Sequence, residues 1–187
     1  MTETESLTGQ FLIAMPAMTD PNFEQTVSFI CQHNQDGALG IVINRTMDLT
    51  MGDVLVQMEI PSTDCNRSDQ PVHYGGPVQS ERGFVLHDQP DAWESTVAID
   101  ERIGLTTSRD ILEAIARNEG PEHALIALGY AGWGGGQLEQ EITRNTWLSS
   151  PGNIDLMFST PVEQRWNRAA NLLGVDLSLL SREAGHA

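Results

Sequence analysis

Residues 124–130, ALIALGY, form the segment that most constrains how this chain can fold. The run is apolar on both faces of an extended strand, and strands of that kind lie in the middle of a sheet, covered on both sides. The other strand candidates outnumber the helix candidates and do not alternate with them along the chain. We therefore predict an α+β fold with a strand-rich sheet, in preference to a doubly wound βαβ fold.

Local signals place further elements around this central strand. Residues 26–33 and 38–44 read as two strands joined by Asn-Gln-Asp-Gly, which predicts a hairpin. Three helices have recognisable starts, at Thr50 with Asp53 in a capping box, at Thr107 or Ser108, and at Thr160 with Pro161 and Glu163 in a second capping box. We find no internal repeat and no low-complexity segment.

Size and charge bound the domain organisation and the function classes. A chain of 187 residues with 40% hydrophobic residues suits one core, so we take residues 1–187 as a single domain. It carries 26 acidic and 10 basic residues, a net charge of −16, and every basic residue is arginine. Without lysine it can form no Schiff base and has no P-loop lysine. The missing lysine fits a GC-rich genome or a salt-adapted surface equally well.

The cysteines and the apolar runs bear on location. Cys31 and Cys65 are too few for a disulfide framework, and Cys31 lies in an apolar run where a buried, reduced thiol is expected. No basic residue precedes Arg45, so residues 11–18 lack the charged start of a signal peptide. Apolar runs stay far below the roughly 20 residues of a membrane-spanning helix. We predict a cytoplasmic protein with no membrane association.

The glycine-rich stretch at residues 129–141, GYAGWGGGQLEQE, is a candidate phosphate site, but its chemistry argues against that use. No register supplies the G-x-G-x-x-G pattern, and no lysine completes a P-loop. A helix that begins near Gly136 would carry Glu139 in its first turn, where a carboxylate repels phosphate. Trp133, flanked by glycines, is either a lid over a pocket or a plug in the core. We favour the plug because large aromatic residues are usually buried.

Several separate motifs, in order along the chain, resemble those of the YqgE/AlgH family of bacterial proteins. They are FLIAMPAMTDPNFEQTV, HNQDGALGIVIN, GGPV before RGFVLH, GYAGWGGGQLEQEI followed by NTWL, and LSREAGHA at the C-terminus. The resemblance covers nearly the whole chain. It implies an α+β fold whose bifurcated sheet curls into a pseudo-barrel, here with about four helices packed around it. Glycines 134–136 stand where bulkier residues are usual, which implies a more flexible loop.

The same resemblance leaves the activity open. Proteins of this family are commonly labelled transcriptional regulators, on the basis of regulatory phenotypes and not of a recognised DNA-binding element. Their activity is not established, so no catalytic residue carries over to this chain.

Signals for catalysis and for metal binding are weak. No G-x-S-x-G elbow occurs. Cys31 and His33 share one face of a strand, but a buried thiol and a histidine at a turn favour a structural interpretation. The histidines, His33, His73, His87, His123 and His186, show no metal-ligand spacing. His73 and His87 would face each other if their strands paired, although a structural role is favoured. We predict no catalytic residue, no metal and no cofactor.

The strongest candidate site combines two glycine-rich stretches with nearby aromatic and polar residues. Its candidate residues are Gly75, Gly76, Arg82, His87, Tyr130, Trp133 and Gln137. If the two stretches are adjacent, they leave a shallow backbone-lined groove with an aromatic wall, suited to an extended peptide or a small ligand. The alternative, which we favour, is that both are tight turns required by a curled sheet.

Three function classes follow from the sequence. The first is a non-enzymatic regulator that acts on gene expression indirectly, through a protein partner. The second is a small-molecule or peptide binder, or a hydrolase, that uses the glycine-rich groove. The third is direct DNA binding, which the acidic composition and the absence of a helix-turn-helix or zinc-finger spacing oppose.

Overall fold

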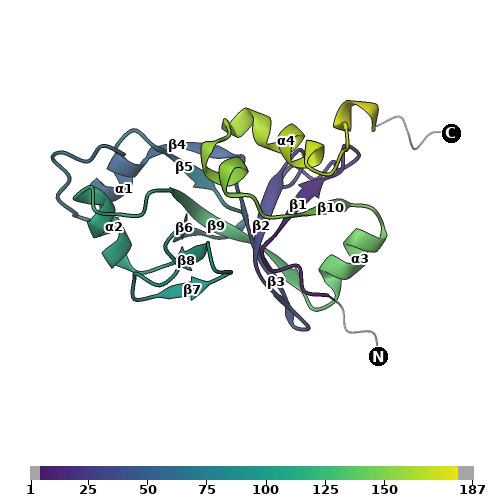
Figure 1. The fold of residues 1–187 in the computed structure, drawn as a ribbon, viewed down its shortest axis with the longest axis horizontal. Helices are drawn as coiled ribbons and strands as arrows, with labels where there is room; N and C mark the ends of the chain where they lie inside the picture. The colour runs from purple at the N-terminus through teal and green to yellow at the C-terminus, as the bar shows by residue number, and fades with distance from the viewer. Residues whose placement is uncertain (1–4, 181–187) are drawn as a thin grey trace. The chain divides into compact units, whose positions relative to one another are not determined.

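The computed structural model describes residues 5–180 (Figure 1). His186, and all but the first residue of the C-terminal LSREAGHA motif, lie outside the described residues. The chain forms two compact units: unit 1 comprises Met1–Arg45, Gly75–Val78 and Tyr130–Ala187, and unit 2 comprises Thr46–Tyr74 and Gln79–Gly129. The assignment of residues 1–187 to one domain stays a prediction.

Unit 1 is built on an antiparallel sheet. In spatial order its strands are β10 (Trp147–Pro151), β1 (Gln10–Ala14), β2 (Val27–Asn34), β3 (Gly37–Val42) and the C-terminal part of β9 (Ala124–Gly134). Strands β2 and β3 form the predicted hairpin, with Asn34 opposite Gly37. Gly37 has a φ of 138°, and a Cβ atom there would lie 2.2 Å from the carbonyl oxygen of Trp133. Only glycine fits where these strands meet.

Short helical segments complete unit 1. They are α3 (Gln137–Thr143), the π-helical η1 (Asp155–Ser159), the 3₁₀ segments η2 (Val162–Gln164) and η3 (Leu177–Leu179), and α4 (Arg165–Asn171). In the described part of the chain, no helix has the length and apolar character that crossing a membrane requires.

The predicted capping box of Thr160 and Glu163 is wrong. Pro161 has a ψ of 138°, an extended conformation, and the α-helix begins only at Arg165. The Thr160 hydroxyl donates to the carbonyl of Asp155 at 3.2 Å, within the preceding π-helical turn. Arg165 is buried, and its Nε donates to the carbonyl of Thr160 at 2.9 Å. Burial lowers the pKa of Arg165 to about 10. The buried guanidinium of Arg165 therefore holds the chain at Thr160 through this hydrogen bond. Sequence spacing does not reveal such a contact.

Unit 2 combines mixed strand pairing with two helices. Its strands are β4 (Thr46–Thr50), β5 (Pro71–Tyr74), β6 (Val78–His87), β7 (Thr96–Ala98), β8 (Gly104–Thr106) and the N-terminal part of β9, and its helices are α1 (Met51–Gln57) and α2 (Arg109–Ala116). Strand β5 pairs antiparallel with β4 and parallel with β9, while β8 pairs antiparallel with β6 and β7.

One apolar core joins the helices and strands of unit 2. Met51 and Leu55 of α1, and Ile111 and Ile115 of α2, are buried in it with Ile126 of β9. The spacing of four residues places each helical pair on one helix face. In β9, side chains on both faces of the strand are buried, as predicted for residues 124–130.

The predicted fold class is confirmed. The described residues form a strand-rich α+β fold with four α-helices. Strand β9 pairs with β5 at Ala127 and Leu128 and with β3 at residues 131–134, so its neighbour changes along its length. This change of partner is the predicted bifurcation of the sheet.

We predict that Thr50→Ala lowers the free energy of unfolding by about 1 kcal/mol. The Thr50 hydroxyl accepts from the N–H of Asp53 at 3.2 Å, and the Asp53 carboxylate accepts from the N–H of Thr50 at 2.9 Å. The substitution leaves a donor at the start of α1 without its acceptor. Urea denaturation measures the change. Thr63→Ala, at an exposed turn, is the matched control and should change the value by less than about 0.5 kcal/mol. Equal effects of both substitutions would contradict the prediction.

Candidate functional site

The two glycine-rich stretches do meet, within unit 1. Gly76 has a φ of 152°, and a Cβ atom there would lie 2.1 Å from the carbonyl carbon of Tyr130. The carbonyl of Gly75 accepts from the N–H of Val42 at 2.9 Å. Backbone lies directly on backbone at this point, so the position of Gly76 excludes any side chain. The interpretation of these glycines as a requirement of the sheet therefore has a direct structural basis.

A shallow groove of about 540 Å³ is nevertheless present in unit 1. Its walls come from the β2–β3 hairpin, the start of β6 and the end of β9: Gln32, Asn34, Asp36, Gly37, Ala38, Leu39, Val78, Tyr130, Gly132 and Trp133. Of the predicted site residues, Tyr130 and Trp133 belong to this lining. The lining does not include Gly75, Gly76, Arg82, His87 or Gln137. Its use as a binding site stays a prediction.

Trp133 is buried in the core, which was the favoured alternative for this residue. The side chain is 6% exposed and packs against Phe23 and Trp147, with ring centroids 6.1 Å away in both cases. The indole N–H groups of Trp133 and Trp147 both donate to Oε1 of Glu141, at 3.2 and 3.0 Å. Glu141 thus satisfies two buried donors, a role that sequence reasoning missed.

The glycine loop is held by a hydrogen bond from its backbone to the side chain of Gln137. Gly136, with a φ of 77°, precedes α3, and Oε1 of Gln137 accepts from the N–H of Gly134 at 3.0 Å. Glu139 stands in the first turn of α3, where the sequence placed a carboxylate unfavourable to phosphate. Gln137 therefore stabilises the turn.

His33 and Cys31 have structural environments. Nδ1 of His33 accepts from the N–H of Leu7 at 2.9 Å, so the ring proton is on Nε2, which donates to Oε1 of Glu139. Cys31 is fully surrounded by protein, and burial raises the pKa of its thiol well above the usual range. A thiol that stays protonated is a poor nucleophile, which supports the structural interpretation of this pair.

The predicted site residues divide between the two units. Gly75, Gly76, Tyr130, Trp133 and Gln137 belong to unit 1, whereas Arg82 and His87 belong to unit 2. Arg82 is exposed, with its guanidinium carbon 5.2 Å from the ring centroid of Phe84. His87 is fully buried, where a dissolved ligand does not reach it.

The suggested pairing of His73 with His87 is wrong. Their strands, β5 and β6, do not pair with each other, because each lies beside β9. A different cluster in unit 2 brings together Asp88, Glu122 and His123, whose potential ligand atoms all lie within 4.8 Å of one another. Asp88 already accepts from the His123 ring Nδ1 at 2.9 Å and from its backbone N–H at 3.2 Å. These two hydrogen bonds connect the end of β6 to the start of β9.

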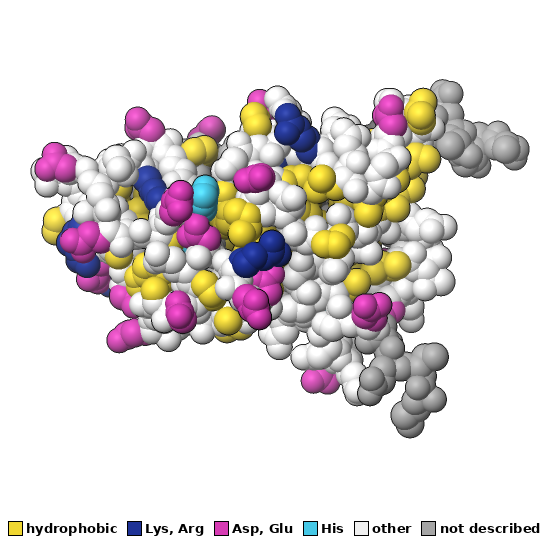
Figure 2. All heavy atoms as spheres, in the orientation of Figure 1, with side chains coloured by type: hydrophobic (Ala, Val, Ile, Leu, Met, Phe, Trp, Pro, Cys, Tyr) yellow, Lys and Arg dark blue, Asp and Glu magenta, His cyan; other side chains and the backbone are white. Residues whose placement is uncertain are grey.

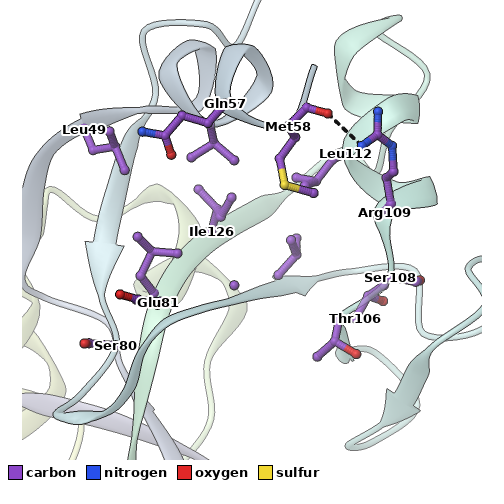
Figure 3. Close-up of a pocket in the computed structure, with 15 residues that line it drawn as sticks. Leu49, Gln57, Met58, Ser80, Glu81, Thr106, Ser108, Arg109, Leu112 and Ile126 are labelled. Atoms are coloured by element: carbon purple, nitrogen blue, oxygen red, sulfur yellow. Dashed lines mark hydrogen bonds between the residues drawn. The ribbon is translucent and has the colours of Figure 1, made fainter. Parts of the chain in front are cut away.

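Unit 2 also holds a cavity of about 450 Å³, which sequence reasoning missed (Figure 3). Its apolar lining is Leu49, Val54, Met58, Val85, Leu112, Ile126 and Leu128, and its other lining residues are Gln57, Ser80, Glu81, Gly83, Thr106, Thr107, Ser108 and Arg109. Its size falls within the range of about 300–1,000 Å³ that is typical of small-molecule sites.

The periodicity of each element explains which side chains line the cavity. Glu81, Gly83 and Val85 alternate along β6 and therefore share one face of that strand. Ile126 and Leu128 alternate in the same way along β9. A Cβ atom at Gly83 would meet one atom, 3.9 Å away on Leu128. Gly83 is exposed, and the missing side chain at this position leaves space beside Leu128 that belongs to the cavity. A glycine within an alternating strand was the signal for it.

Comparisons with known proteins agree with this architecture. A family model described as AlgH-like matches residues 11–178. A UPF0301 protein of Thioalkalivibrio sulfidiphilus is 57% identical over the full length of both chains, and one of Methylococcus capsulatus is 55% identical over 98% of both. The solution structure of the AlgH protein from Pseudomonas aeruginosa matches with a TM-score of 0.79, at 47% identity, over 100% of both chains. Protein DIP2367 of Corynebacterium diphtheriae, at 20% identity and a TM-score of 0.75 over 97% of this chain and 94% of that one, shares the fold.

We predict that His87 makes the protein less stable as the pH falls from 7 to 5. Nδ1 of His87 accepts from the N–H of Gln89 at 3.1 Å, and Nε2 donates to the Thr106 hydroxyl at 2.7 Å. A second ring proton would point at the Gln89 donor, inside the protein. Burial lowers the pKa of His87 to about 4, against a smaller opposing effect of the Asp88 charge.

The unfolded chain, with an ordinary histidine pKa of about 6.5, binds the proton first. Stability is therefore present above pH 6.5 and is lost as the pH falls toward 4. Urea denaturation should show about 2 kcal/mol less stability at pH 5 than at pH 7 from this residue. The measure is the difference between the wild type and His87→Gln at each pH. If both proteins lose the same stability over this range, the prediction is wrong.

Proposed function

The chain belongs to the AlgH-like family, and we propose that it is a non-enzymatic binding protein whose cavity in unit 2 takes up a small amphipathic molecule. The single observation that carries this proposal is the cavity itself. It is already formed in the protein, most of its lining surface is apolar, and polar side chains contribute the rest (Figure 3). That combination is typical of small-molecule sites.

The chemistry of the lining supports binding without catalysis. The cavity lining contains hydroxyl groups but neither histidine nor cysteine. A serine or threonine nucleophile needs an adjacent base, and the buried His87 is already hydrogen-bonded through both ring nitrogens. The hydrolase alternative gains no support from the groove in unit 1 either, since that lining has no serine, histidine or cysteine.

Indirect regulation through a protein partner, the first role expected from the sequence, is a second candidate. The groove in unit 1 favours it, because the groove is shallow and presents both polar side chains and the backbone at Gly132 beside Tyr130. Such surfaces accept extended peptides. A regulator that senses a ligand in the cavity would combine both roles. A cytoplasmic location is part of the same proposal. The support for this location comes from the sequence alone.

We predict that Nile red, a neutral apolar dye, binds in the cavity with increased fluorescence. Gly83→Leu should weaken this binding at least tenfold, because the new side chain extends into the space that Gly83 leaves open. The strand position tolerates a Cβ atom, with its nearest neighbour at 3.9 Å. Fluorescence titration measures the dissociation constants. A parallel urea denaturation shows that each variant is folded.

Gly132→Leu is the matched control. Gly132 lines the groove in unit 1, and a Cβ atom there would lie 3.5 Å from the Tyr130 ring, an ordinary contact distance. This variant should bind the dye as the wild type does. Loss of dye binding in Gly132→Leu but not in Gly83→Leu would move the site to the groove and contradict the proposal.

We also predict that the protein does not bind duplex DNA with a dissociation constant in the micromolar range or below. DNA affinity depends mainly on Arg and Lys side chains that neutralise phosphates. In Figure 2, acidic side chains are spread over the visible face, and basic side chains are few. Fluorescence anisotropy at about 50 mM salt, where phosphate contacts are strongest, is the test. Tight binding that weakens steeply with added salt would revive a direct role on DNA.

A further inference from the structure

The charged groups at the cavity differ in how fully they are already bound. Arg109, on α2, is engaged with three acceptors: its Nε donates to Oε1 of Glu113 at 3.0 Å, and its terminal nitrogens donate to the carbonyls of Met58 and Glu59 at 2.7 and 3.5 Å. In Figure 3 its guanidinium reaches toward the Met58 carbonyl. The charge of Arg109 is therefore balanced by Glu113, and its strongest donors are in use.

Glu81 stands in contrast to Arg109. Within the described residues its carboxylate has no hydrogen bond and no ion pair, and the residue is exposed. It shares the cavity-facing side of β6 with Gly83 and Val85. Ser80, its neighbour, and Gln57 of α1 also line the cavity and can accept hydrogen bonds. The free charge available to a ligand in the cavity is thus negative.

We propose that the ligand of the cavity is a cationic amphipath, in which an alkyl or aryl body carries a primary ammonium group. This inference rests on the proposed function and adds to it the charge of the ligand. The body lies against the apolar walls, which include Val54, Leu112, Ile126 and Leu128. The ammonium pairs with the Glu81 carboxylate, and its remaining N–H groups donate to acceptors at the cavity such as the side-chain oxygen of Gln57. Three donors on one nitrogen suit this set of acceptors.

The same charges disfavour an anionic ligand. A carboxylate head group would lie near the unpaired Glu81, and like charges repel at short range. The net charge of −16 adds a long-range attraction for cations and a repulsion for anions. An uncharged head group avoids the repulsion but gains no ion pair. The expected order of affinity is ammonium, then alcohol, then carboxylate.

Displacement of Nile red by three ligands of equal chain length tests this order. Decylammonium, decanol and decanoate are titrated at pH 7.5 into the full-length protein, each below the concentration at which it forms micelles. Decylammonium should bind about fivefold more tightly than decanol, the gain expected from one partly exposed ion pair. Decanoate should bind more weakly than decanol. Added salt should reduce the preference for ammonium.

Glu81→Gln is the decisive variant, because it removes the charge and keeps the shape. It should weaken decylammonium about fivefold and leave decanol unchanged. Glu101→Gln removes one exposed carboxylate outside the cavity lining and controls for the net charge of the protein. It should leave the preference for ammonium as in the wild type.

The outcomes separate this inference from the proposed function. If Gly83→Leu abolishes dye binding but decylammonium and decanol compete equally in the wild type, the cavity binds ligands and the cationic inference is wrong. The inference is also wrong if Glu81→Gln keeps the preference for ammonium, or if Glu101→Gln removes it. If Gly83→Leu binds the dye as the wild type does, the proposed function fails and the inference fails with it.

Discussion

The burial of β9 on both faces is the constraint on which the rest of this structure depends. The strand contributes its N-terminal part to unit 2 and its C-terminal part to unit 1, so each unit has to cover both sides of its own portion. In unit 2, Ile126 enters the core that α1 and α2 share. In unit 1, Ala131 and Trp133 enter a second core with Trp147. An apolar strand that changes partners along its length thus organises both cores.

Close backbone contacts are the second organising feature, and they explain the glycines better than a binding loop does. Gly37 lies against the carbonyl of Trp133, and Gly76 lies against the backbone of Tyr130. Neither position has room for a Cβ atom, and both have positive φ values. Gly83 has a different role. It has space around it, and that space is the cavity.

Most buried polar groups of interest for chemistry are already hydrogen-bonded within the fold. Glu141 receives two indole donors, His33 donates to Glu139, and His87 uses both ring nitrogens. A group that is fully hydrogen-bonded in the interior stabilises the native state but has no free site for a substrate. Polar side chains that can act on a ligand include those at the cavity, where Glu81 has no ion pair with any described residue.

The sequence alone determined the elements that depend on local spacing. The apolar run of β9, the β2–β3 hairpin, the Thr50–Asp53 capping box and the apolar faces of α1 and α2 all follow from periods of two or of about 3.6 residues. Only the tertiary structure decided which segments meet. Arg82 and His87 are not in the lining of the glycine-rich groove, a buried Arg165 stands in place of the capping box at Thr160, and a cavity lies beside Gly83. The physical reason is that a cavity, or a buried charge, is defined by side chains far apart in sequence, and local periodicity carries no information about their distance.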